Sequence, residues 1–116
     1  MGQLTTHVLD ISAGVPAAGV RIDLHEQGAE GLRLLVSAVT GPDGRVGTPL
    51  LSGESFKTGR YLLTFHTADY FRARGVVLPQ PAFLEQAGIQ IGIAADQHYH
   101  VPLLIAPWSY SVYRGG

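Results

Sequence analysis

The chain has 116 residues, of which 46% are hydrophobic and 15% are charged, and its formal net charge is −1. This length predicts a single domain over residues 1–116, with enough apolar residues to fill one core. The basic residues are scattered and Lys57 is the only lysine, so no basic surface for nucleic acid is expected. No apolar run approaches the ~20 residues that span a bilayer. The sequence has no cysteine, which excludes disulfides and thiolate chemistry.

The composition also suggests a compartment and a state of assembly. Residues 1–4 lack the basic and apolar regions of a signal peptide, so the cytoplasm is the expected compartment. A small β domain with so little surface charge is expected to bury further surface against other copies of itself.

Strand patterns follow one another along the chain. Alternating apolar and polar residues at 20–25 predict a half-buried strand, and a turn at 27–31 separates it from an apolar strand at 32–40. The sequence GPDG at 41–44 predicts a tight turn, because proline presets φ and Gly44 accepts a positive φ. Further strands are expected at residues 61–65, 89–93, 99–105 and 108–114.

One short helix interrupts the strands. Thr67 is the expected N-cap, Asp69 lies in the first turn, and Gly75 is expected to end the helix. Residues 76–83, which include two prolines, are expected to form an extended loop. Short strands with turns at this spacing predict an all-β protein, a two-sheet antiparallel β-sandwich with one short helix.

Five histidines are the candidates for proton transfer. His98 and His100 are two residues apart on a predicted strand, which places both imidazoles on one face, roughly 7 Å apart. This spacing alone is as typical of a half-exposed strand start as of a site, and His7 taken singly is more typical of a polar edge-strand residue. His25 lies on the polar face of its strand and is expected to be solvated. A structural or capping role is expected for His66.

Arg45 and the C-terminal residues complete the set of candidates. Arg45 follows the turn at 41–44, a position typical of an ordinary exposed arginine. Its guanidinium group, however, is permanently charged and suits bidentate binding of a planar oxyanion. Terminal residues usually fray, but an apolar strand here runs up to residues 113–116, which are therefore expected to be held in place.

Taken together and in this order, the segments resemble one family, the transthyretin-like proteins, and specifically their 5-hydroxyisourate hydrolase branch. The similarity covers nearly the whole chain, and its strongest block is HYHVPLL at 98–104. The other matching segments are residues 4–10 (LTTHVLD), 14–20 (GVPAAGV), 43–45 (DGR), 49–51 (PLL), Phe56, 59–61 (GRY), Phe65, 70–71 (YF), Pro107, 110–111 (YS) and 113–115 (YRG).

The resemblance implies a fold, an assembly and a reaction. The fold is a two-sheet β-sandwich with a short helix, assembled as a homotetramer whose active sites lie at the dimer–dimer interface. The substrate is 5-hydroxyisourate, formed in purine catabolism after urate oxidation, and its six-membered ring is opened by hydrolysis of a C–N amide bond. No metal or organic cofactor is implied.

The resemblance also assigns residues to roles by position. The implied catalytic residues are His7, Arg45 and His100. The implied substrate-binding residues are His98, Tyr113, Arg114, Gly115 and Gly116. The family pattern ends in a serine where this chain has Gly116, so a hydroxyl group is missing, and the lost hydrogen bond would cost on the order of 1 kcal/mol.

The chemistry of ring opening is consistent with these residue types. A histidine with an ordinary pKa of ~6.5 can accept a proton from water near neutral pH, which contributes roughly 10²–10⁴ in rate. Arg45 can stabilise the negative charge that forms on the carbonyl oxygen. We expect His7 and His100 to divide the base and orienting roles, and the sequence does not assign them.

Three alternatives stay open at this point. A transthyretin-like small-molecule carrier would share the fold, although the carrier branch lacks the histidines matching His7 and His100. A zinc-dependent cyclic amide hydrolase could use His98, His100 and His7 as metal ligands. The third alternative is an inert sandwich retained for assembly, and only Gly116 points to it.

Overall fold

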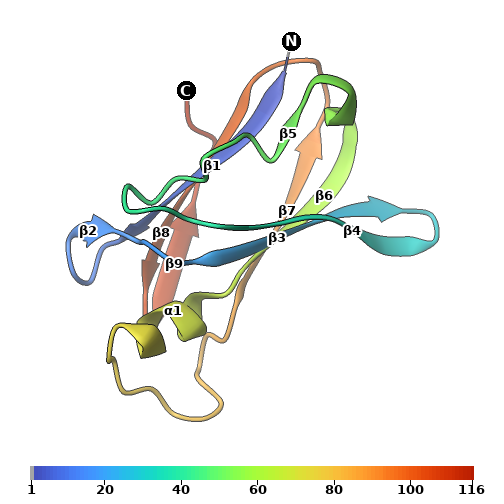
Figure 1. Cartoon of the computed structure of the whole chain (residues 1–116). Coiled ribbons are helices and arrows are strands. Elements are labelled where there is room, and N and C mark those ends of the chain that lie inside the picture. Colours follow the sequence, from blue (N-terminus) through green and yellow to red (C-terminus); the bar gives the residue numbers. More distant parts are fainter. Residues whose placement is uncertain (1) are drawn as a thin grey trace.

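The computed structural model describes residues 2–116 and consists of two β-sheets packed face to face, with a short helix at one end (Figure 1). The strands are β1 (Gln3–Asp10), β2 (Val15–Pro16), β3 (Arg21–Gly28), β4 (Gly31–Val39), β5 (Leu51–Ser52), β6 (Gly59–Phe65), β7 (Ala87–Ile93), β8 (Tyr99–Ala106) and β9 (Ser109–Val112). The helical elements are a 3₁₀ turn, η1 (Gly53–Ser55), and the α-helix α1 (Thr67–Ala73). No helix within residues 2–116 is long and apolar enough to cross a membrane.

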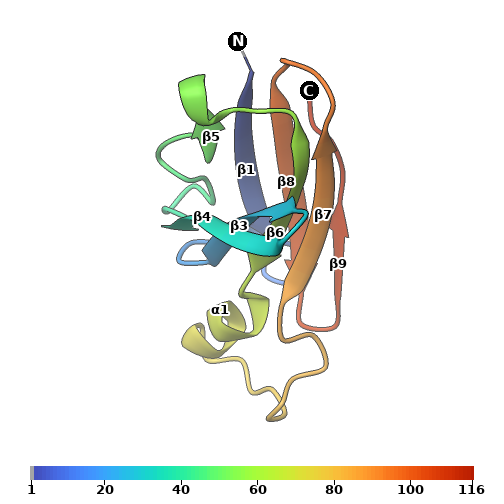
Figure 2. The ribbon, with the colours of Figure 1, turned by 90° about the vertical axis from the view of Figure 1, so that its right-hand side faces the viewer.

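The strand order confirms the predicted two-sheet sandwich. The first sheet has the order β2-β1-β8-β9, with β5 also paired to β1, and the second has the order β4-β3-β6-β7. Seen from the side, the edge strands β7 and β9 lie at the same side of the molecule (Figure 2). The expectation of antiparallel pairing was wrong for one pair of strands, because β1 and β8 pair in parallel. The chain reaches β8 by crossing over from β7 in the other sheet, not through a hairpin, so β8 can run in the direction of β1.

Strand β1 presents one face to the core and one face outward. Every second residue from Leu4 onward is buried, including the polar Thr6 and Asp10. The Thr6 hydroxyl donates to a main-chain carbonyl of β8 at 2.7 Å, and Asp10 accepts a hydrogen bond from the Tyr70 hydroxyl at 2.9 Å. Because Thr6 and Asp10 are polar although buried, the sequence of β1 does not show the alternation of buried and outward residues. The strand therefore places His7, like the residue two before it, on the outer face of the sheet.

Strand β8 continues the same arrangement. Its odd-numbered residues from 99 to 105 are buried in the core, so His100 and Pro102 lie on the opposite face. In the parallel pairing, Thr5 lies opposite His100 and His7 lies opposite Pro102. Two segments from opposite ends of the sequence thus bring their polar side chains onto one outer surface.

The helix ends as predicted but begins differently. Gly75 adopts a positive φ of 87° and follows the last turn, as expected. The N-cap position is occupied by His66, and Thr67 is the first helical residue, buried and without a side-chain cap. The prediction that Thr67 is the N-cap was wrong. The side chain of His66 is bonded to Asp23 at 2.8 Å, which holds the backbone just before the helix, so His66 takes the N-cap position.

The predicted environment of His25 was wrong as well. The side chain is half-buried, and within residues 2–116 its Nδ1 atom is buried without a hydrogen-bond partner. The physical reason is its cross-strand neighbours, since His25 lies between Leu34 of β4 and Leu62 of β6. The outer face of the second sheet is therefore less polar than the alternation in β3 suggests.

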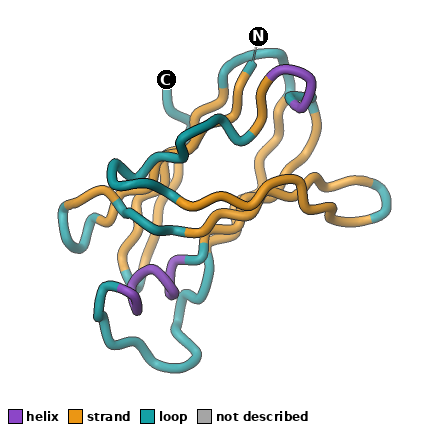
Figure 3. The backbone as a smooth tube through the Cα atoms, viewed as in Figure 1, coloured by secondary structure: helices purple, strands orange, loops and turns teal. Residues whose placement is uncertain are grey.

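The connections and the C-terminus differ from the expected boundaries by a few residues. The turn expected at 27–31 contains only two residues between β3 and β4, and β9 ends at Val112, earlier than the predicted strand at 108–114. Residues 76–83 form a loop, as predicted. Figure 3 shows this loop and the long connection between β4 and β5, which crosses from the second sheet to the first.

Candidate active site

The connection between β4 and β5 places Arg45 beside His7. The two residues form an isolated antiparallel bridge, and the Val8 N–H donates to the Gly44 carbonyl at 2.9 Å. Gly44 has a φ of +78°, and a Cβ atom there would overlap the Val8 carbonyl oxygen. The Asp43 carboxylate accepts the Arg45 N–H at 3.0 Å and closes the turn. The turn predicted from the sequence therefore delivers Arg45 to the outer face of β1.

His7 is tied to this turn through its ring. Its Nε2 lies 3.0 Å from the Asp43 carbonyl oxygen. A carbonyl oxygen can only accept a hydrogen bond, so Nε2 must carry the hydrogen, and the Nδ1 of a neutral His7 is then unprotonated. His7 thus holds the turn that carries Arg45 against β1.

His98 and His100 lie on one side of the sheet, as their spacing predicts. Their ring centroids are 6.4 Å apart, and the ring planes differ by only 9°. Both rings contact the Thr5 hydroxyl, which lies 2.8 Å from Nδ1 of His100 and 3.4 Å from Nε2 of His98. Thr5 was not among the residues predicted for the site. Its signal was its position two residues before His7 on the same face of one strand.

The surroundings of His100 lower its pKa. Burial is the largest cause, because it disfavours the charged imidazolium form. The positive charge of Arg45 acts in the same direction, followed by those of His7 and His98. A lowered pKa keeps His100 neutral, and thus able to accept a proton, down to a lower pH than an ordinary histidine.

A pocket of about 420 Å³ opens on this outer surface. It is lined by Thr5, Thr6, Arg45, Val46, His98, His100 and Gly116. Gly115 lies at its border, where its N–H donates to the His100 carbonyl at 2.8 Å. A Cβ atom at Gly115 would lie 2.8 Å from Cδ2 of His100, so only glycine allows this close approach. The C-terminal segment is held in place, as expected.

Tyr113 and Arg114 lie elsewhere within the single chain. They line a different pocket of about 460 Å³, between β9 and the edge strand β7. The Arg114 guanidinium lies 4.0 Å from the centroid of the Tyr99 ring, and its Nη2 donates to the His98 carbonyl at 3.2 Å. The structure therefore brings Arg45, His98, His100, Gly115 and Gly116 together but leaves Tyr113 and Arg114 outside the pocket. Their substrate-binding role stays a prediction.

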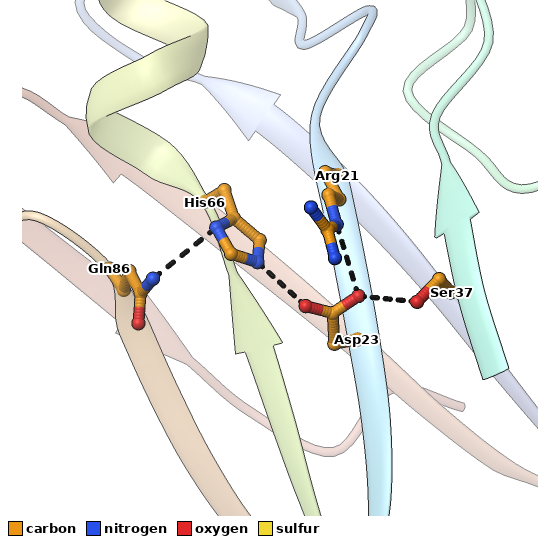
Figure 4. A network of polar contacts seen from close by, with 5 residues as sticks. All are labelled: Arg21, Asp23, Ser37, His66 and Gln86. Atoms are coloured by element: carbon orange, nitrogen blue, oxygen red, sulfur yellow. Dashed lines mark hydrogen bonds and ion pairs between the residues drawn. The ribbon is translucent and has the colours of Figure 1, made fainter. Parts of the chain in front are cut away.

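A second polar cluster surrounds His66, on the outer face of the other sheet (Figure 4). The Asp23 carboxylate lies 2.8 Å from Nε2 of His66 and accepts the Ser37 hydroxyl at 2.7 Å and the Arg21 Nε at 3.2 Å. Burial alone would raise the pKa of Asp23, but the hydrogen bonds from Ser37, His66 and Arg21 lower it to about 2. The Ser37 contact joins β4 to β3, and the His66 contact joins the residue before α1 to β3, whereas Arg21 and Asp23 both lie on β3. The structural role expected for His66 is therefore supported.

A zinc site of the kind considered above is not formed by a single chain. Within residues 2–116, no group of three or more His, Cys, Asp or Glu side chains lies close enough to hold a metal ion. His98 and His100 instead share the Thr5 hydroxyl, and the ring of His7 is bonded to the turn at Asp43.

Several curated proteins are similar to this chain over nearly its full length. The 5-hydroxyisourate hydrolase of Pseudomonas aeruginosa is 54% identical over 99% of this chain and 92% of its own length. The 5-hydroxyisourate hydrolase 2 of Rhizobium meliloti is 54% identical over 98% of this chain and 96% of its own length.

Solved structures share the fold. An (S)-allantoin synthase superposes with a TM-score of 0.92 at 44% identity, and the match covers 99% of this chain but 44% of that one. The 5-hydroxyisourate hydrolase of Klebsiella pneumoniae gives 0.84 at 37% identity and covers both chains fully. Sea bream transthyretin in complex with thyroxine gives a TM-score of 0.87 at 26% identity, covering 97% of this chain and 94% of its own.

The model of the HIUase/Transthyretin family matches residues 4–115. With this match and the relatives that are 54% identical, the chain belongs to the HIUase/Transthyretin family.

Proposed function

We propose that the protein is a 5-hydroxyisourate hydrolase of urate and purine catabolism, which opens the six-membered ring of its substrate by C–N amide hydrolysis. The observation that carries the proposal is the pocket that joins a half-buried His100, whose pKa is lowered by burial and by Arg45, to the guanidinium of Arg45. The relatives from P. aeruginosa and R. meliloti bear the name of this activity.

In the proposed mechanism, His100 is the general base. Its Nδ1 is bonded to Thr5, which leaves Nε2 as the ring nitrogen available to a water molecule in the pocket. Its lowered pKa favours the neutral form that can take a proton. As the water oxygen bonds to the carbonyl carbon, one water proton passes to Nε2 of His100.

Arg45 stabilises the charge that this addition creates on the carbonyl oxygen. A guanidinium group is permanently charged and carries two donors in one plane, so it can bind the oxyanion and a neighbouring oxygen of the ring together. His7 has an orienting role in this scheme, because its Nε2–H bond to the Asp43 carbonyl holds the turn that carries Arg45.

Collapse of the intermediate completes the reaction. The C–N bond breaks as the carbonyl re-forms, and the ring nitrogen leaves with the proton held on Nε2 of His100. The base is thereby regenerated, and no charge accumulates over the cycle. His98, Gly115 and Gly116 border the same space and are proposed to contact the substrate.

The assembly is part of the proposal. A homotetramer with sites at the dimer–dimer interface would cover the outer face that carries the pocket. It would also cover the unpaired edges of β7 and β9, where Tyr113 is more than half exposed. Packing of that kind could bring Tyr113 and Arg114 close to the pocket of a neighbouring copy. Sedimentation equilibrium should give four times the chain mass of 12.4 kDa, and a monomer would contradict this part of the proposal.

The activity is tested with the substrate itself. Urate oxidase generates 5-hydroxyisourate from urate in the cuvette, and its decay is followed by ultraviolet absorbance with and without the purified protein. We expect decay well above the spontaneous rate, and unchanged decay after treatment with a chelator. Decay at the spontaneous rate would overturn the proposed function, and activity restored only by stoichiometric zinc would favour the metal-dependent alternative.

The carrier alternative has one observation in its favour, which is the fold. The TM-score with sea bream transthyretin is as high as that with the Klebsiella hydrolase, so the fold does not separate the two functions. The site residues do, because a carrier has no need for a base beside a guanidinium group. Calorimetric titration with thyroxine is expected to give no binding, and tight binding without ring-opening activity would favour the carrier.

A further inference from the structure

The Thr5 hydroxyl lies between the two imidazoles of the candidate site. Its Oγ1 is 2.8 Å from Nδ1 of His100 and 3.4 Å from Nε2 of His98. Thr5 pairs with His100 in the ladder between β1 and β8, so the backbone fixes the distance between their side chains. The branched Cβ of threonine further restricts where the hydroxyl can point.

A hydroxyl group has a single hydrogen, and this limits how the three groups can bond. Thr5 can donate to only one of the two ring nitrogens, while its oxygen can accept from the other. In the first arrangement His100 donates its Nδ1–H to Thr5, and Thr5 donates to Nε2 of His98. In the second arrangement both directions are reversed. An arrangement in which both rings donate to the Thr5 oxygen would leave the hydroxyl hydrogen without a partner among these three groups. Where that hydrogen is bonded to a ring, the proton positions on the two rings are coupled through Thr5.

Of these two arrangements, only the first is compatible with both charge states of His100. A protonated imidazole carries hydrogen on both nitrogens and can only donate. The bond from Nδ1–H to Thr5 keeps its direction when Nε2 of His100 gains a proton. It also becomes stronger, because the donor is then charged. The second arrangement would force the hydroxyl to turn away from His100 at that moment. A site whose dipoles need not reorient has the lower barrier.

We propose that Thr5 is a positioning residue that holds His100 as the Nδ1–H tautomer, with His98 accepting the hydrogen of the Thr5 hydroxyl. His100 then presents an unprotonated Nε2 to the pocket. Besides His98, the charged or titratable groups that act on the ring are Arg45 and His7. The effect on turnover rests on the proposed function, whereas the tautomer itself does not.

The tautomer can be measured without substrate. Long-range ¹H–¹⁵N correlation spectra of the ¹⁵N-labelled protein distinguish protonated from unprotonated ring nitrogens in each histidine. We expect Nδ1–H for both His100 and His98 at a pH where both are neutral. In Thr5→Val, which keeps the shape but removes the hydroxyl, the signals of His100 should shift towards a mixture of tautomers. A predominant Nε2–H form of His100 in the unaltered protein would overturn the inference.

Kinetics provide a second test with matched variants. Thr5→Val should lower kcat by roughly ten- to a hundredfold, the range seen for groups that orient imidazoles in metal sites, with KM little changed. Thr5→Ser keeps the hydroxyl and should recover most of kcat. Thr64→Val, on the outward side of β6 in the other sheet, is the control and should leave kcat unchanged.

Two kinetic outcomes would contradict the inference in variants that remain folded by circular dichroism. One is an unchanged kcat in Thr5→Val, and the other is a loss in Thr5→Ser as large as in Thr5→Val. If the unaltered protein shows no ring-opening activity, the proposed function fails, and the spectra still decide whether Thr5 sets the tautomer of His100.

Discussion

The outer faces of the two sheets each hold a histidine in a polar network, and the partners differ. His66 lies 2.8 Å from the carboxylate of Asp23, a partner of opposite charge to its imidazolium form. His100 instead lies beside a neutral hydroxyl, with the positive charge of Arg45 nearby. A carboxylate that receives several hydrogen bonds fixes the geometry of the ring beside it, whereas a cationic neighbour favours a neutral ring that can accept a proton.

The two networks also differ in whether a polar atom remains free for a ligand. Asp23 is 8% exposed and receives hydrogen bonds on both carboxylate oxygens, so the cluster has little capacity for another molecule. The network at His100 borders an open pocket of about 420 Å³. A histidine in a polar cluster therefore points to chemistry when its partners leave it accessible to a ligand.

Exchange of the two histidines for asparagine should give the largest contrast. His100→Asn removes the proposed base and should lower kcat by roughly 10²–10⁴ with little change in unfolding free energy. His66→Asn should leave kcat nearly unchanged but lower the unfolding free energy by about 1–3 kcal/mol, because Asp23 loses a buried hydrogen bond. Turnover and urea denaturation measured on both variants test this. A large kcat loss in His66→Asn would remove the distinction between the two networks.

The next largest effect is expected at Arg45, where two variants separate charge from shape. Arg45→Lys loses the planar pair of donors and should lower kcat by about 10²–10³. Arg45→Gln also removes the positive charge that lowers the pKa of His100, so that pKa should rise.

The pH profile of kcat/KM distinguishes the two arginine variants. Because the base must be unprotonated, the acid limb should move to higher pH in Arg45→Gln and stay nearly in place in Arg45→Lys. An acid limb at the same pH in Arg45→Gln and in the unaltered protein would show that Arg45 does not act on His100 through its charge.

Asp23→Asn tests the structural network with a smaller effect. The pKa of Asp23 is about 2 in the folded protein and 3.8 ordinarily, so its ionised form contributes about 2 kcal/mol of stability at neutral pH. That contribution is present above pH ~4 and is lost as the pH falls towards 2. Urea denaturation of both proteins between pH 7 and 2 should show a difference that shrinks with acidification. A difference that is independent of pH would contradict the assigned role.

The smallest effect is expected at the C-terminus. Gly116→Ser restores the hydroxyl present in the family pattern, and no atom of residues 2–116 outside its immediate neighbours lies within 4 Å of where its Cβ would stand. One added hydrogen bond is worth on the order of 1 kcal/mol, so kcat/KM should rise by less than tenfold. A larger gain would contradict this estimate and would mean that the missing serine hydroxyl limits the reaction.

Much of the fold was predictable because strand alternation and turn chemistry are local properties. The turn at 41–44 and the outward face of His100 follow directly from neighbouring residues. The alternation in β1 was hidden, because Thr6 and Asp10 are buried polar residues whose partners lie on other elements. The parallel pairing of β1 with β8 was not predictable from local patterns, because it depends on the path of the chain between the two sheets.

The candidate site was predictable in part. His7, Arg45 and His100 were identified by resemblance, and the structure brings Arg45 beside both histidines. Thr5 was missed because threonine is common in strands, and its significance depends on two rings more than ninety residues away. The placement of Tyr113 and Arg114 outside the pocket could not be inferred, since neighbours in sequence at a strand end need not share a face.

The parallel pairing of β1 and β8 has a consequence for the order of events during synthesis. Thr5 and His100 are separated by 95 residues, so their contact forms only after nearly the whole chain has been made. Closing so long a loop is slow compared with forming a hairpin, and it comes late in folding. While residues 98–115 are still in the ribosome, the nascent chain carries His7 and Arg45 but cannot place them beside His98 and His100. In the proposed tetramer, docking of the last strands must precede assembly of the site, so turnover would signal that both folding and assembly are complete.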